Sequence, residues 1–363
     1  MAVRGHRRSV PSSAFGRCRE RDRTDERTEG GTYRMRTTTD AIWFERAKSA
    51  VYAPVELPDP GPRDLVVRAE YSGVSMGTEI WYYSGRRTGD IRFPAVPGYQ
   101  TVGIVESAGA DVVGFAPGDR VFVSKGNISE KHPRNWFGAH MRTLVADFET
   151  AIKIEDGIDP REAVFSGMPA VSMRGFGYLK TQPGDKVIVI GQGMIGQMSA
   201  QLSKIHGLHV MATDHYPMRV EMSAAHSSHR AVTASEVDLV AWVKEQTDGA
   251  GADIVIDTTG VPSIFKQCVD LVRHRGQIVM QGWYPEPISV DFHLTHLKEP
   301  TVYFPCGFYK EAQLQALGWL KTGELKIDPL ITHVFHPKDC QEAYQLMLQR
   351  PAETLNVLFD WEQ

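Results

Sequence analysis

The hydrophobic positions of this chain follow two patterns, and the change between them falls near Asp159. Before it, short β-branched runs such as residues 65–67, 102–105 and 120–123 alternate with turns rich in proline and glycine. This spacing predicts a compact domain of mostly antiparallel strands. After it, short apolar runs alternate with segments whose apolar residues recur at helical spacing, which is typical of βαβ units and a parallel sheet.

The second pattern predicts a doubly wound α/β sheet of six parallel strands. We expect its strands at residues 187–190, 208–213, 231–232, 254–256, 278–280 and 301–304, with helices at 163–178, 194–205, 219–225, 236–246 and 263–272. A helix at 311–321, a strand at 331–335, a helix at 340–348 and a strand at 356–359 follow. The simplest architecture inserts the parallel sheet, residues 161–307, into a β-rich domain made of residues 35–160 and 308–363.

The glycine-rich segment at the start of the parallel sheet carries the strongest local signal. Gly191, Gln192, Gly193, Met194, Ile195 and Gly196 form a G-x-G-x-x-G sequence between a β-branched run and a helical one. In a dinucleotide site the first glycine permits the tight turn, the second lets the pyrophosphate approach the backbone, and the third lets helix and strand pack closely. The phosphates then meet free N–H groups at the positive end of a helix. The motif therefore predicts dinucleotide binding, against the alternative of an ordinary βαβ crossover.

An acidic residue indicates which dinucleotide is bound. Asp214 ends the second strand, close to the spacing of about 20 residues expected for the carboxylate that hydrogen-bonds an adenosine ribose. A carboxylate there would repel a 2′-phosphate, so NAD is favoured over NADP, although Arg219 nearby is a residue that can accommodate such a phosphate. Because ligands bind at the carboxyl ends of parallel strands, we also expect Thr258, Thr259 and Gly282 beside the cofactor.

Composition and charge exclude several classes of protein. The chain of 363 residues is 42% hydrophobic and 23% charged, which is ordinary for a globular protein with a large core. Its formal net charge of −4 argues against nucleic acid as the main partner. Its apolar stretches are all shorter than the ~18 residues that a membrane span needs.

The cysteines and the first residues bear on location. Four cysteines, separated too widely for a metal knuckle or a disulfide framework, favour a reducing cytoplasm. Residues 1–34 hold nine arginines and five acidic residues without apolar periodicity, which predicts a disordered tail. The acidic residues do not fit an organelle-targeting leader. Met35 precedes the first strand-like segment and is an alternative natural start.

Five ordered segments resemble the medium-chain dehydrogenase/reductase superfamily. They are residues 71–75, 97–103, 118–121, the glycine motif and residues 329–333. The resemblance implies a GroES-like catalytic domain around an NAD-binding Rossmann domain, and a homodimer that pairs through the strand at 301–304. Residues 72–79, 83–85 and 96–99 are most similar to a zinc-free branch that includes bacteriochlorophyllide dehydrogenase, which oxidises a secondary alcohol on a tetrapyrrole side chain.

The positions that hold the catalytic zinc in this superfamily carry other residues in this chain. In zinc-binding members a cysteine, a Gly-His-Glu sequence and a later Cys or Glu hold the zinc. Here Ser75 stands at the cysteine position, Tyr99 and Gln100 replace His and Glu, and Ser166 or Gly167 falls at the third ligand position. Hydroxyls and an amide are poor zinc ligands beside thiolate and imidazole. We therefore expect no zinc.

Without zinc, side-chain donors must handle the alcohol proton and polarise its oxygen. Tyr99 is the first candidate, because it stands at the vacated position and a nicotinamide cation beside it would lower its pKa from the usual ~10. The alternative for Tyr99 is a packed core tyrosine. Ser75 and Thr78 are candidates to donate or relay a proton. The superfamily's relay hydroxyl falls at Gly77, so a relay would have to be rebuilt.

Four further residues complete the catalytic candidates. Glu79 is a candidate base, or else it pairs with an arginine such as Arg86 or Arg87. Gln100 is expected to polarise an oxygen or to hold Tyr99. His132, in a charged loop, and His140, in a predicted strand, are further candidates.

These features lead to one main functional hypothesis and two alternatives. The main hypothesis is a zinc-independent, NAD-dependent oxidoreductase that transfers a hydride between a secondary alcohol and the nicotinamide, the alcohol being a polyol, a cyclitol or another natural-product alcohol. The first alternative is an NADPH-dependent quinone or enoyl reductase, against which Asp214 argues. The second is a non-catalytic NAD-binding protein, which the loss of the metal ligands favours.

Overall fold

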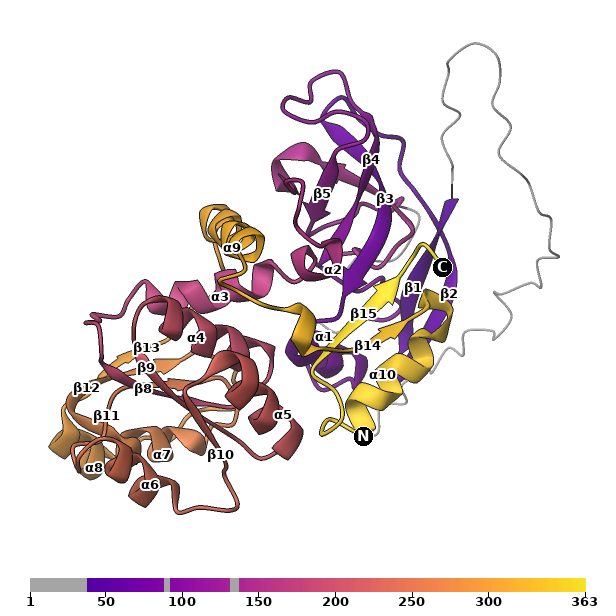
Figure 1. Ribbon diagram of the computed structural model, residues 1–363. Coiled ribbons are helices and arrows are strands. Elements are labelled where there is room, and N and C mark those ends of the chain that lie inside the picture. Colours follow the sequence, from indigo (N-terminus) through magenta and orange to yellow (C-terminus); the bar gives the residue numbers. More distant parts are fainter. Residues whose placement is uncertain (1–37, 88–91, 131–136) are drawn as a thin grey trace, which may run out of the picture. The chain divides into compact units, whose positions relative to one another are not determined.

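The computed structural model of the protein describes residues 38–87, 92–130 and 137–363. The predicted disordered tail, residues 1–34, and the candidate His132 lie outside these ranges. The described part of the chain contains two large sheets, a two-stranded hairpin and the helices that pack on them, and both large sheets belong to one compact unit (Figure 1).

The six-stranded sheet confirms the predicted doubly wound fold. Its order is β10-β9-β8-β11-β12-β13, and every neighbouring pair is parallel. Numbered along the chain this is the 3-2-1-4-5-6 order of dinucleotide-binding sheets. The strands are β8 (Lys186–Ile190), β9 (His209–Asp214), β10 (Arg230–Thr233), β11 (Ala252–Asp257), β12 (Val272–Met280) and β13 (Thr301–Tyr303).

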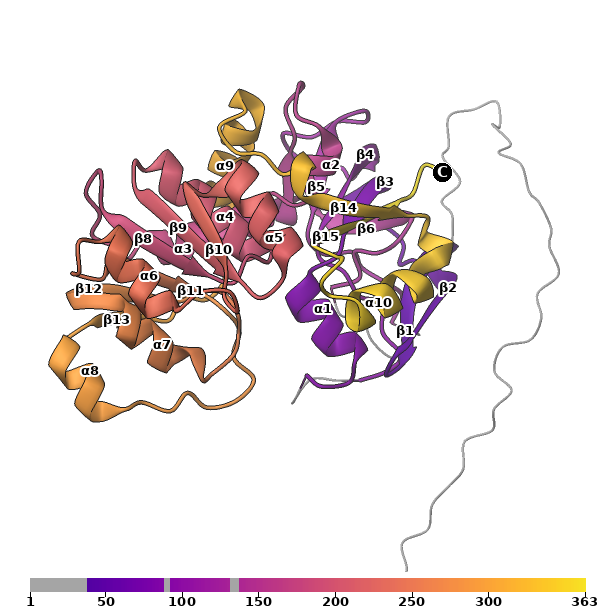
Figure 2. The same ribbon diagram turned by 60° about the horizontal axis from the view of Figure 1, so that its bottom comes forward.

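Helices cover both faces of this sheet. Two apolar clusters lie on opposite faces, one shared with α6, α7 and α8 and the other with α3 and α4 (Figure 2). The central strand β8 therefore buries all four of its apolar residues, which explains its continuous β-branched run. The helices are α3 (Gly167–Phe176), α4 (Met194–Ile205), α5 (Pro217–Met222), α6 (Leu239–Gln246), α7 (Ile264–Leu271) and α8 (Phe292–Lys298).

Several element boundaries differ from the prediction for identifiable reasons. The helix expected at 163–178 is broken into α2 (Pro160–Ala163) and α3, because Pro169 has no N–H to continue a helix and lies in the first turn of α3. Helix α6 starts three residues later than expected, since the Asp238 side chain accepts hydrogen bonds from the Val240 and Ala241 N–H groups and so caps it. Helix α8 and helix α1 (Met76–Tyr83) were not predicted.

The seven-stranded sheet combines strands from the first and the last parts of the chain. Its path is β14-β15-β3-β4-β5-β7, with β6 paired to β3, and every pair is antiparallel except β14 with β15. Figure 1 shows the last strands, in yellow, beside the early strand β3. Its strands are β3 (Asp64–Gly73), β4 (Thr101–Ala108), β5 (Arg120–Val123), β6 (Thr143–Asp147), β7 (Ala151–Lys153), β14 (Ile331–Phe335) and β15 (Asn356–Asp360).

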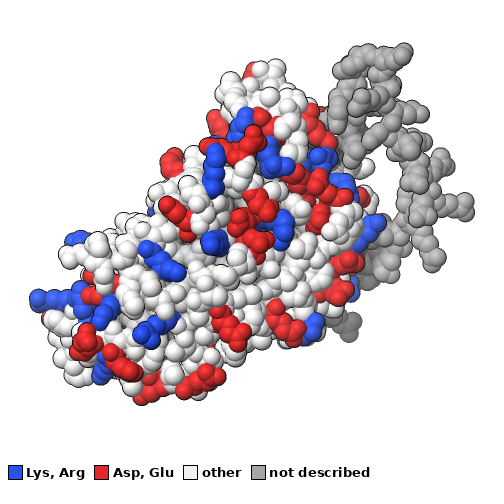
Figure 3. Space-filling model, in the orientation of Figure 1, with Lys and Arg blue, Asp and Glu red and all other residues white. Residues whose placement is uncertain are grey.

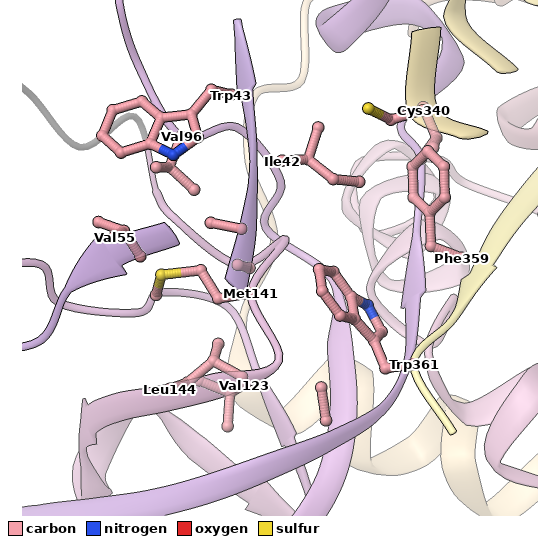
Figure 4. Close-up of a cluster of buried hydrophobic side chains, with 14 of the residues drawn as sticks. Ile42, Trp43, Val55, Val96, Val123, Met141, Leu144, Cys340, Phe359 and Trp361 are labelled. Atoms are coloured by element: carbon pink, nitrogen blue, oxygen red, sulfur yellow. The ribbon is translucent and has the colours of Figure 1, made fainter. Parts of the chain in front are cut away.

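The hairpin β1 (Thr38–Arg46) and β2 (Ser49–Glu56) closes an apolar core with helix α10 (Cys340–Gln349), while α9 (Lys310–Thr322) packs on α3. Figure 4 shows this core, in which Ile42 of β1 lies near Phe359 and Trp361 from the C-terminal end of the chain, while Trp43 points to the other side, near Val96. Nearly all of these side chains are fully buried. The sequence predicted that the last residues return to the first domain. They do so because their apolar side chains complete this core.

The surface shows no strong separation of charge on the face in Figure 3, where Lys and Arg intermix with Asp and Glu. That face lacks the continuous basic area which nucleic-acid binding needs. In the part of the chain that the structure describes, no helix has the length and apolar character to cross a membrane.

Candidate active site

A cavity of about 590 Å³ lies between the two large sheets. Its walls come from the end of β3 and helix α1, from α3, from the start of α4, and from the loops that follow β9, β11 and β12. The size is in the range of ~300–1,000 Å³ typical of small-molecule sites. Its position at the carboxyl ends of parallel strands is where ligands of such sheets bind.

The glycine motif forms a tight turn beside this cavity. Gly191 has a φ of +87°, which favours glycine, and Gly193 caps helix α4 without a side-chain hydrogen bond. A Cβ on Gly196 would lie 1.8 Å from the carbonyl oxygen of Gly191, so only glycine lets the helix pack here. Gly193, Met194 and Ile195 line the cavity. These residues fit a dinucleotide pyrophosphate at the helix start, as the motif predicted.

Asp214 and Arg219 flank the turn. The Asp214 carboxylate accepts hydrogen bonds from the backbone N–H groups of Gln192, at 2.6 Å, and Tyr216, at 2.9 Å. Arg219 lines the cavity and donates to the carbonyl oxygens of Pro351 and Thr354, at 2.9 and 3.0 Å. Burial lowers the pKa of the Arg219 guanidinium below its ordinary value, partly opposed by the Asp214 charge. Asp214 therefore lies at the turn itself, while Arg219 also joins α5 to the C-terminal segment.

The loops after β11 and β12 supply the other predicted cofactor residues. Thr258 and Thr259 line the cavity, and Thr258 Oγ1 donates to the carbonyl oxygen of Gly191 at 2.9 Å. Gly282 also lines it, and a Cβ there would lie 2.6 Å from the N of Gly260. The structure thus brings Thr258, Thr259 and Gly282 to the cavity that the glycine turn also lines, and their contact with a cofactor stays a prediction.

Three hydroxyl groups meet on the opposite wall. The Tyr99 hydroxyl donates to Ser75 Oγ, and Thr78 Oγ1 lies 3.4 Å from the same phenol oxygen. All three residues line the cavity. Burial raises the pKa of Tyr99 above its usual value, and its hydrogen bonds with Ser75 and Thr78 oppose that rise only in part. The buried phenol therefore keeps its proton and can donate a hydrogen bond. The lower pKa expected for Tyr99 beside a nicotinamide cation stays a prediction.

Glu79 does not line the cavity; it is fully buried behind the wall. Its carboxylate accepts from the Ser75 N–H at 2.9 Å and the Tyr344 hydroxyl at 2.7 Å, and lies 2.9 Å from His140 Nε2. His140 Nδ1 lies 2.8 Å from Ser72 Oγ. Glu79 was a candidate base, with pairing to Arg86 or Arg87 as the alternative; its carboxylate instead belongs to this buried network, which also holds the backbone of the wall residue Ser75.

Two other expectations for this wall are corrected. Gln100 is 1% exposed and does not line the cavity; its amide Nε2 points to the carbonyl oxygen of Gly73 at 3.4 Å, so it neither holds the Tyr99 hydroxyl nor reaches a ligand there. His140 lies in a loop before β6 rather than in a strand. Gly77, at the superfamily's relay position, does line the cavity and leaves open space beside it.

The donor set at the superfamily's metal position does not fit zinc. Ser75 and Tyr99 offer hydroxyls that already bond to each other, and Ser166 Oγ accepts from Gln313 Nε2 at 2.9 Å. Among the residues that the structure describes, no group of three or more His, Cys, Asp or Glu side chains could hold a metal ion. Neutral hydroxyls lack the thiolate or imidazole donors that zinc prefers.

Several site residues were missed by the sequence analysis. Trp81 and Trp283 line the cavity, and Tyr344 supports Glu79. Trp81 could have been found from helix α1, had that helix been predicted. Trp283 and Tyr344 follow no motif, because only the folded chain brings them to this place.

A dinucleotide turn that faces a hydroxyl-lined wall across one cavity is the arrangement that an oxidoreductase using a pyridine nucleotide needs. The alcohol dehydrogenase GroES-like domain family matches residues 61–156, and the zinc-binding dehydrogenase family matches residues 195–322. The chain belongs to the medium-chain dehydrogenase/reductase superfamily, and it is an enzyme of the alcohol and polyol dehydrogenase type within it. The resemblance drawn from the sequence is thereby confirmed.

Curated relatives match most of the chain. A 2-desacetyl-2-hydroxyethyl bacteriochlorophyllide A dehydrogenase of Cereibacter sphaeroides is 27% identical over 333 residues, which cover 90% of this chain and 99% of that protein. An L-threonine 3-dehydrogenase of Aeromonas hydrophila is 28% identical over 340 residues, covering 85% and 95%.

Solved structures share the fold. An Escherichia coli oxidoreductase of unknown specificity superposes with a TM-score of 0.81 at 22% identity, covering 89% of this chain and 99% of that one. A Sinorhizobium meliloti protein described as a zinc-binding dehydrogenase, bound to NADP, has a TM-score of 0.78 at 22% identity, covering 90% and 100%. An Escherichia coli alcohol dehydrogenase complexed with NADH also has a TM-score of 0.78 at 22% identity, covering 89% and 99%. Both cofactors therefore occur on this fold.

Proposed function

We propose that the protein is a zinc-independent, NAD-dependent oxidoreductase that transfers a hydride between a secondary alcohol and nicotinamide. The observation that carries this proposal is the hydroxyl cluster of Tyr99, Ser75 and Thr78 on the wall of the cavity that also holds the glycine turn. Donors aimed at the place where charge develops on an oxygen can replace a metal in polarising it. We propose a polyol, a cyclitol or another natural-product alcohol as the substrate.

The chain's own residues have distinct roles in this proposal. NAD, when bound, supplies the hydride acceptor. Tyr99 holds the alcohol oxygen and exchanges its proton; because burial raises the pKa of Tyr99, the phenol is protonated before a ligand enters and is ready to donate to a ketone oxygen. Ser75 and Thr78 orient the phenol and share its hydrogen bond. Glu79 is a positioning residue, since it touches only the Ser75 backbone and groups behind the wall.

Asp214 supports the choice of NAD over NADP. Its carboxylate lies at the glycine turn, and a 2′-phosphate brought to the adenosine ribose there would meet a negative charge in a partly buried place. Arg219 is close enough to temper that repulsion, but its guanidinium is already bonded to two carbonyl oxygens. Equilibrium binding should therefore favour NADH over NADPH.

A tyrosine replacement tests the proposed catalytic role. Tyr99→Phe should lower kcat for alcohol oxidation by about 10²–10³, the cost of removing one preorganised donor, with a smaller change in NADH affinity. Tyr83→Phe is the matched control, because the Tyr83 hydroxyl is hydrogen-bonded too but donates to the Lys48 carbonyl oxygen outside the cavity. Equal rates for the wild type and Tyr99→Phe would refute the role.

The same assays separate the alternatives. A preference for NADPH with turnover of quinones or enoyl compounds would favour the reductase hypothesis. Cofactor binding without turnover of any alcohol or ketone, and an effect of Tyr99→Phe on stability alone, would favour the non-catalytic hypothesis.

We further propose a cytoplasmic homodimer, with the domain limits inferred from the sequence. Strand β13 is the last strand of the six-stranded sheet, so its outer edge is open to pairing with a second copy. Light scattering after gel filtration tests the dimer, and a monomer at micromolar concentration would argue against it.

A further inference from the structure

The hydrogen-bonded pair formed by Tyr99 and Ser75 is supported from behind by one buried imidazole. His140 does not line the cavity and is fully buried. Its Nε2 lies 2.9 Å from the Glu79 carboxylate, and its Nδ1 lies 2.8 Å from Ser72 Oγ. Buried polar groups need hydrogen-bond partners, and these two contacts satisfy both ring nitrogens. The neighbours of the ring also lead, by two routes, to the two members of the pair.

The first route runs through Glu79 to the start of helix α1. Ser75 is the N-cap residue of this helix, and a serine there commonly accepts a hydrogen bond from an N–H of the first turn. The Ser75 side chain makes no such bond. The Glu79 side chain reaches back and accepts from the Ser75 N–H at 2.9 Å, while the Ser75 hydroxyl is left to accept from Tyr99. The Glu79 carboxylate therefore fixes the backbone that carries this hydroxyl.

The second route runs through Gly98 to Tyr99. Gly98 has a φ of +89°, and a Cβ on it would lie 2.6 Å from two carbon atoms of the His140 ring, so only glycine leaves room for the imidazole. The Ala139 N–H donates to the Gly98 carbonyl oxygen at 2.9 Å. The His140 N–H donates to the Pro97 carbonyl oxygen at 3.1 Å. The ring therefore packs on the residue that precedes Tyr99.

The donors around Ser72 assign the proton on the imidazole. The Trp361 indole N–H, from the segment after β15, donates to Ser72 Oγ at 2.9 Å. An indole nitrogen can only donate, so the Ser72 hydroxyl keeps its own hydrogen for its second contact, His140 Nδ1. That nitrogen is then an acceptor, and Nε2 carries the proton that is donated to Glu79. We call Trp361, Ser72, His140 and Glu79 the His140 network.

The His140 network is closed off from solvent. Glu79 and His140 are both 0% exposed, and the Phe359 ring centroid lies 5.4 Å from that of His140. Hydrogen bonds in such a place are electrostatically stronger than in water, and neighbouring bonds polarise one another. Burial raises the pKa of Tyr99, and the negative charge of Glu79 adds to that rise. The network therefore also favours the protonated phenol.

We propose that His140 is a positioning residue for the hydride transfer, because its one ring holds both Tyr99 and Ser75 in place. It acts from behind the cavity wall and contacts neither substrate nor cofactor. Trp361 acts through it, by directing the Ser72 hydroxyl at the ring. This inference rests on the proposed function, since it assigns the support of the same hydroxyl cluster.

Kinetics of the full-length protein with NAD and an alcohol that it oxidises measure the effect. His140→Phe keeps a ring beside Gly98 but removes both hydrogen bonds, and should lower kcat about tenfold, the scale of a lost buried hydrogen bond. Ser72→Ala and Trp361→Phe remove bonds on the far side of the ring and should each lower kcat about two- to threefold. The dissociation constant of NADH should change by less than about twofold, because the glycine turn belongs to the other large sheet.

A double-mutant cycle separates positioning from a general loss of stability. In a Tyr99→Phe background the phenol is already absent, so His140→Phe should lower kcat by no more than about threefold. Thr247→Val is the control: its buried hydroxyl accepts from the Gly251 N–H at 3.0 Å outside the cavity, and its effect should be equal in both backgrounds. An equal loss for His140→Phe in both backgrounds would overturn the inference, while a low kcat in Tyr99→Phe would still support the proposed function. Ser72→Ala serves in the same cycle if His140→Phe does not fold.

Carbon NMR gives a readout that does not need turnover. In protein labelled at the tyrosine Cζ, the Tyr99 signal is identified by its absence from Tyr99→Phe. This signal should move in His140→Phe and in Ser72→Ala, which changes no ring, while the signal of Tyr303, on β13, should stay in place. If the wild type oxidises no alcohol, the proposed function fails, and this measurement decides the inference. A Tyr99 signal that neither variant moves would overturn it.

Discussion

The buried Glu79 carboxylate allows a prediction whose size can be worked out from its contacts. Glu79→Leu would leave three donors behind the cavity wall without an acceptor: the Ser75 N–H, the Tyr344 hydroxyl and His140 Nε2. Each buried donor that loses its partner costs about 1–3 kcal/mol, and removing the buried charge returns part of this. We expect a net loss of about 3–5 kcal/mol in the free energy of unfolding.

Glu79→Gln should lower the free energy of unfolding by less, about 1–3 kcal/mol. The amide oxygen can still accept from the Ser75 N–H, while the amide nitrogen faces a tyrosine hydroxyl that can rotate and a histidine that can change tautomer. Burial, followed by the Glu79 charge, raises the pKa of Tyr344 well above its ordinary value, so that hydroxyl keeps its proton at every pH of the assay.

Urea unfolding, followed by tryptophan fluorescence at neutral pH, measures both changes. Glu155→Gln is the control: Glu155 is exposed and pairs with Lys321 on the surface, where loss of an ion pair costs less than about 1 kcal/mol. If the free energy of unfolding of Glu79→Leu were within about 1 kcal/mol of the wild-type value, the carboxylate would not stabilise the cavity wall as described. A loss in Glu79→Gln as large as that in Glu79→Leu would contradict the assignment of donors.

Three further predictions concern other parts of the chain. Gly196→Ala should abolish measurable NADH binding in a fluorescence titration, because its Cβ would meet the Gly191 carbonyl oxygen; wild-type affinity would contradict the packing. His229 Nδ1 accepts a hydrogen bond from the Val210 N–H, and burial lowers the pKa of this histidine. Its contribution to the free energy of unfolding should therefore be complete above about pH 6.5 and should be lost as pH falls through the lowered pKa. An NMR titration midpoint for His229 at or above about 6.5 would refute this. Burial raises the pKa of Cys340 to about 12, so in a Cys18→Ser background the exposed Cys306 should react with a thiol reagent at pH ~8 while Cys340 reacts only after unfolding.

The fold could be predicted because its signals are local and regular. The β-branched run of β8, the glycine motif and the helical spacing of α4 lie next to one another in the sequence. Helix α1 was missed because its residues follow the strand β3 directly, without a capping side-chain hydrogen bond or a clear apolar period. The break between α2 and α3 was missed because the apolar pattern runs through Pro169.

The candidate site could be predicted only in part. The residues of the cofactor turn are close in sequence, so their meeting follows from the strand order. The positions of Glu79 and Gln100 depend on packing: Glu79 is turned inward by His140 and Tyr344, which come from distant segments. Spacing along the chain cannot show which side chains of α1 face the cavity, and it gave no sign of Trp283.

We propose that hydroxyl groups, with Tyr99 foremost, take the role that zinc has elsewhere in the superfamily. The most direct test of this proposal measures the rate of NAD-dependent alcohol oxidation before and after dialysis against a strong chelator, with the zinc content determined on the same samples. We expect an unchanged rate in protein that holds far less than one zinc per chain. Loss of activity on dialysis, with recovery when zinc is added back, would contradict it.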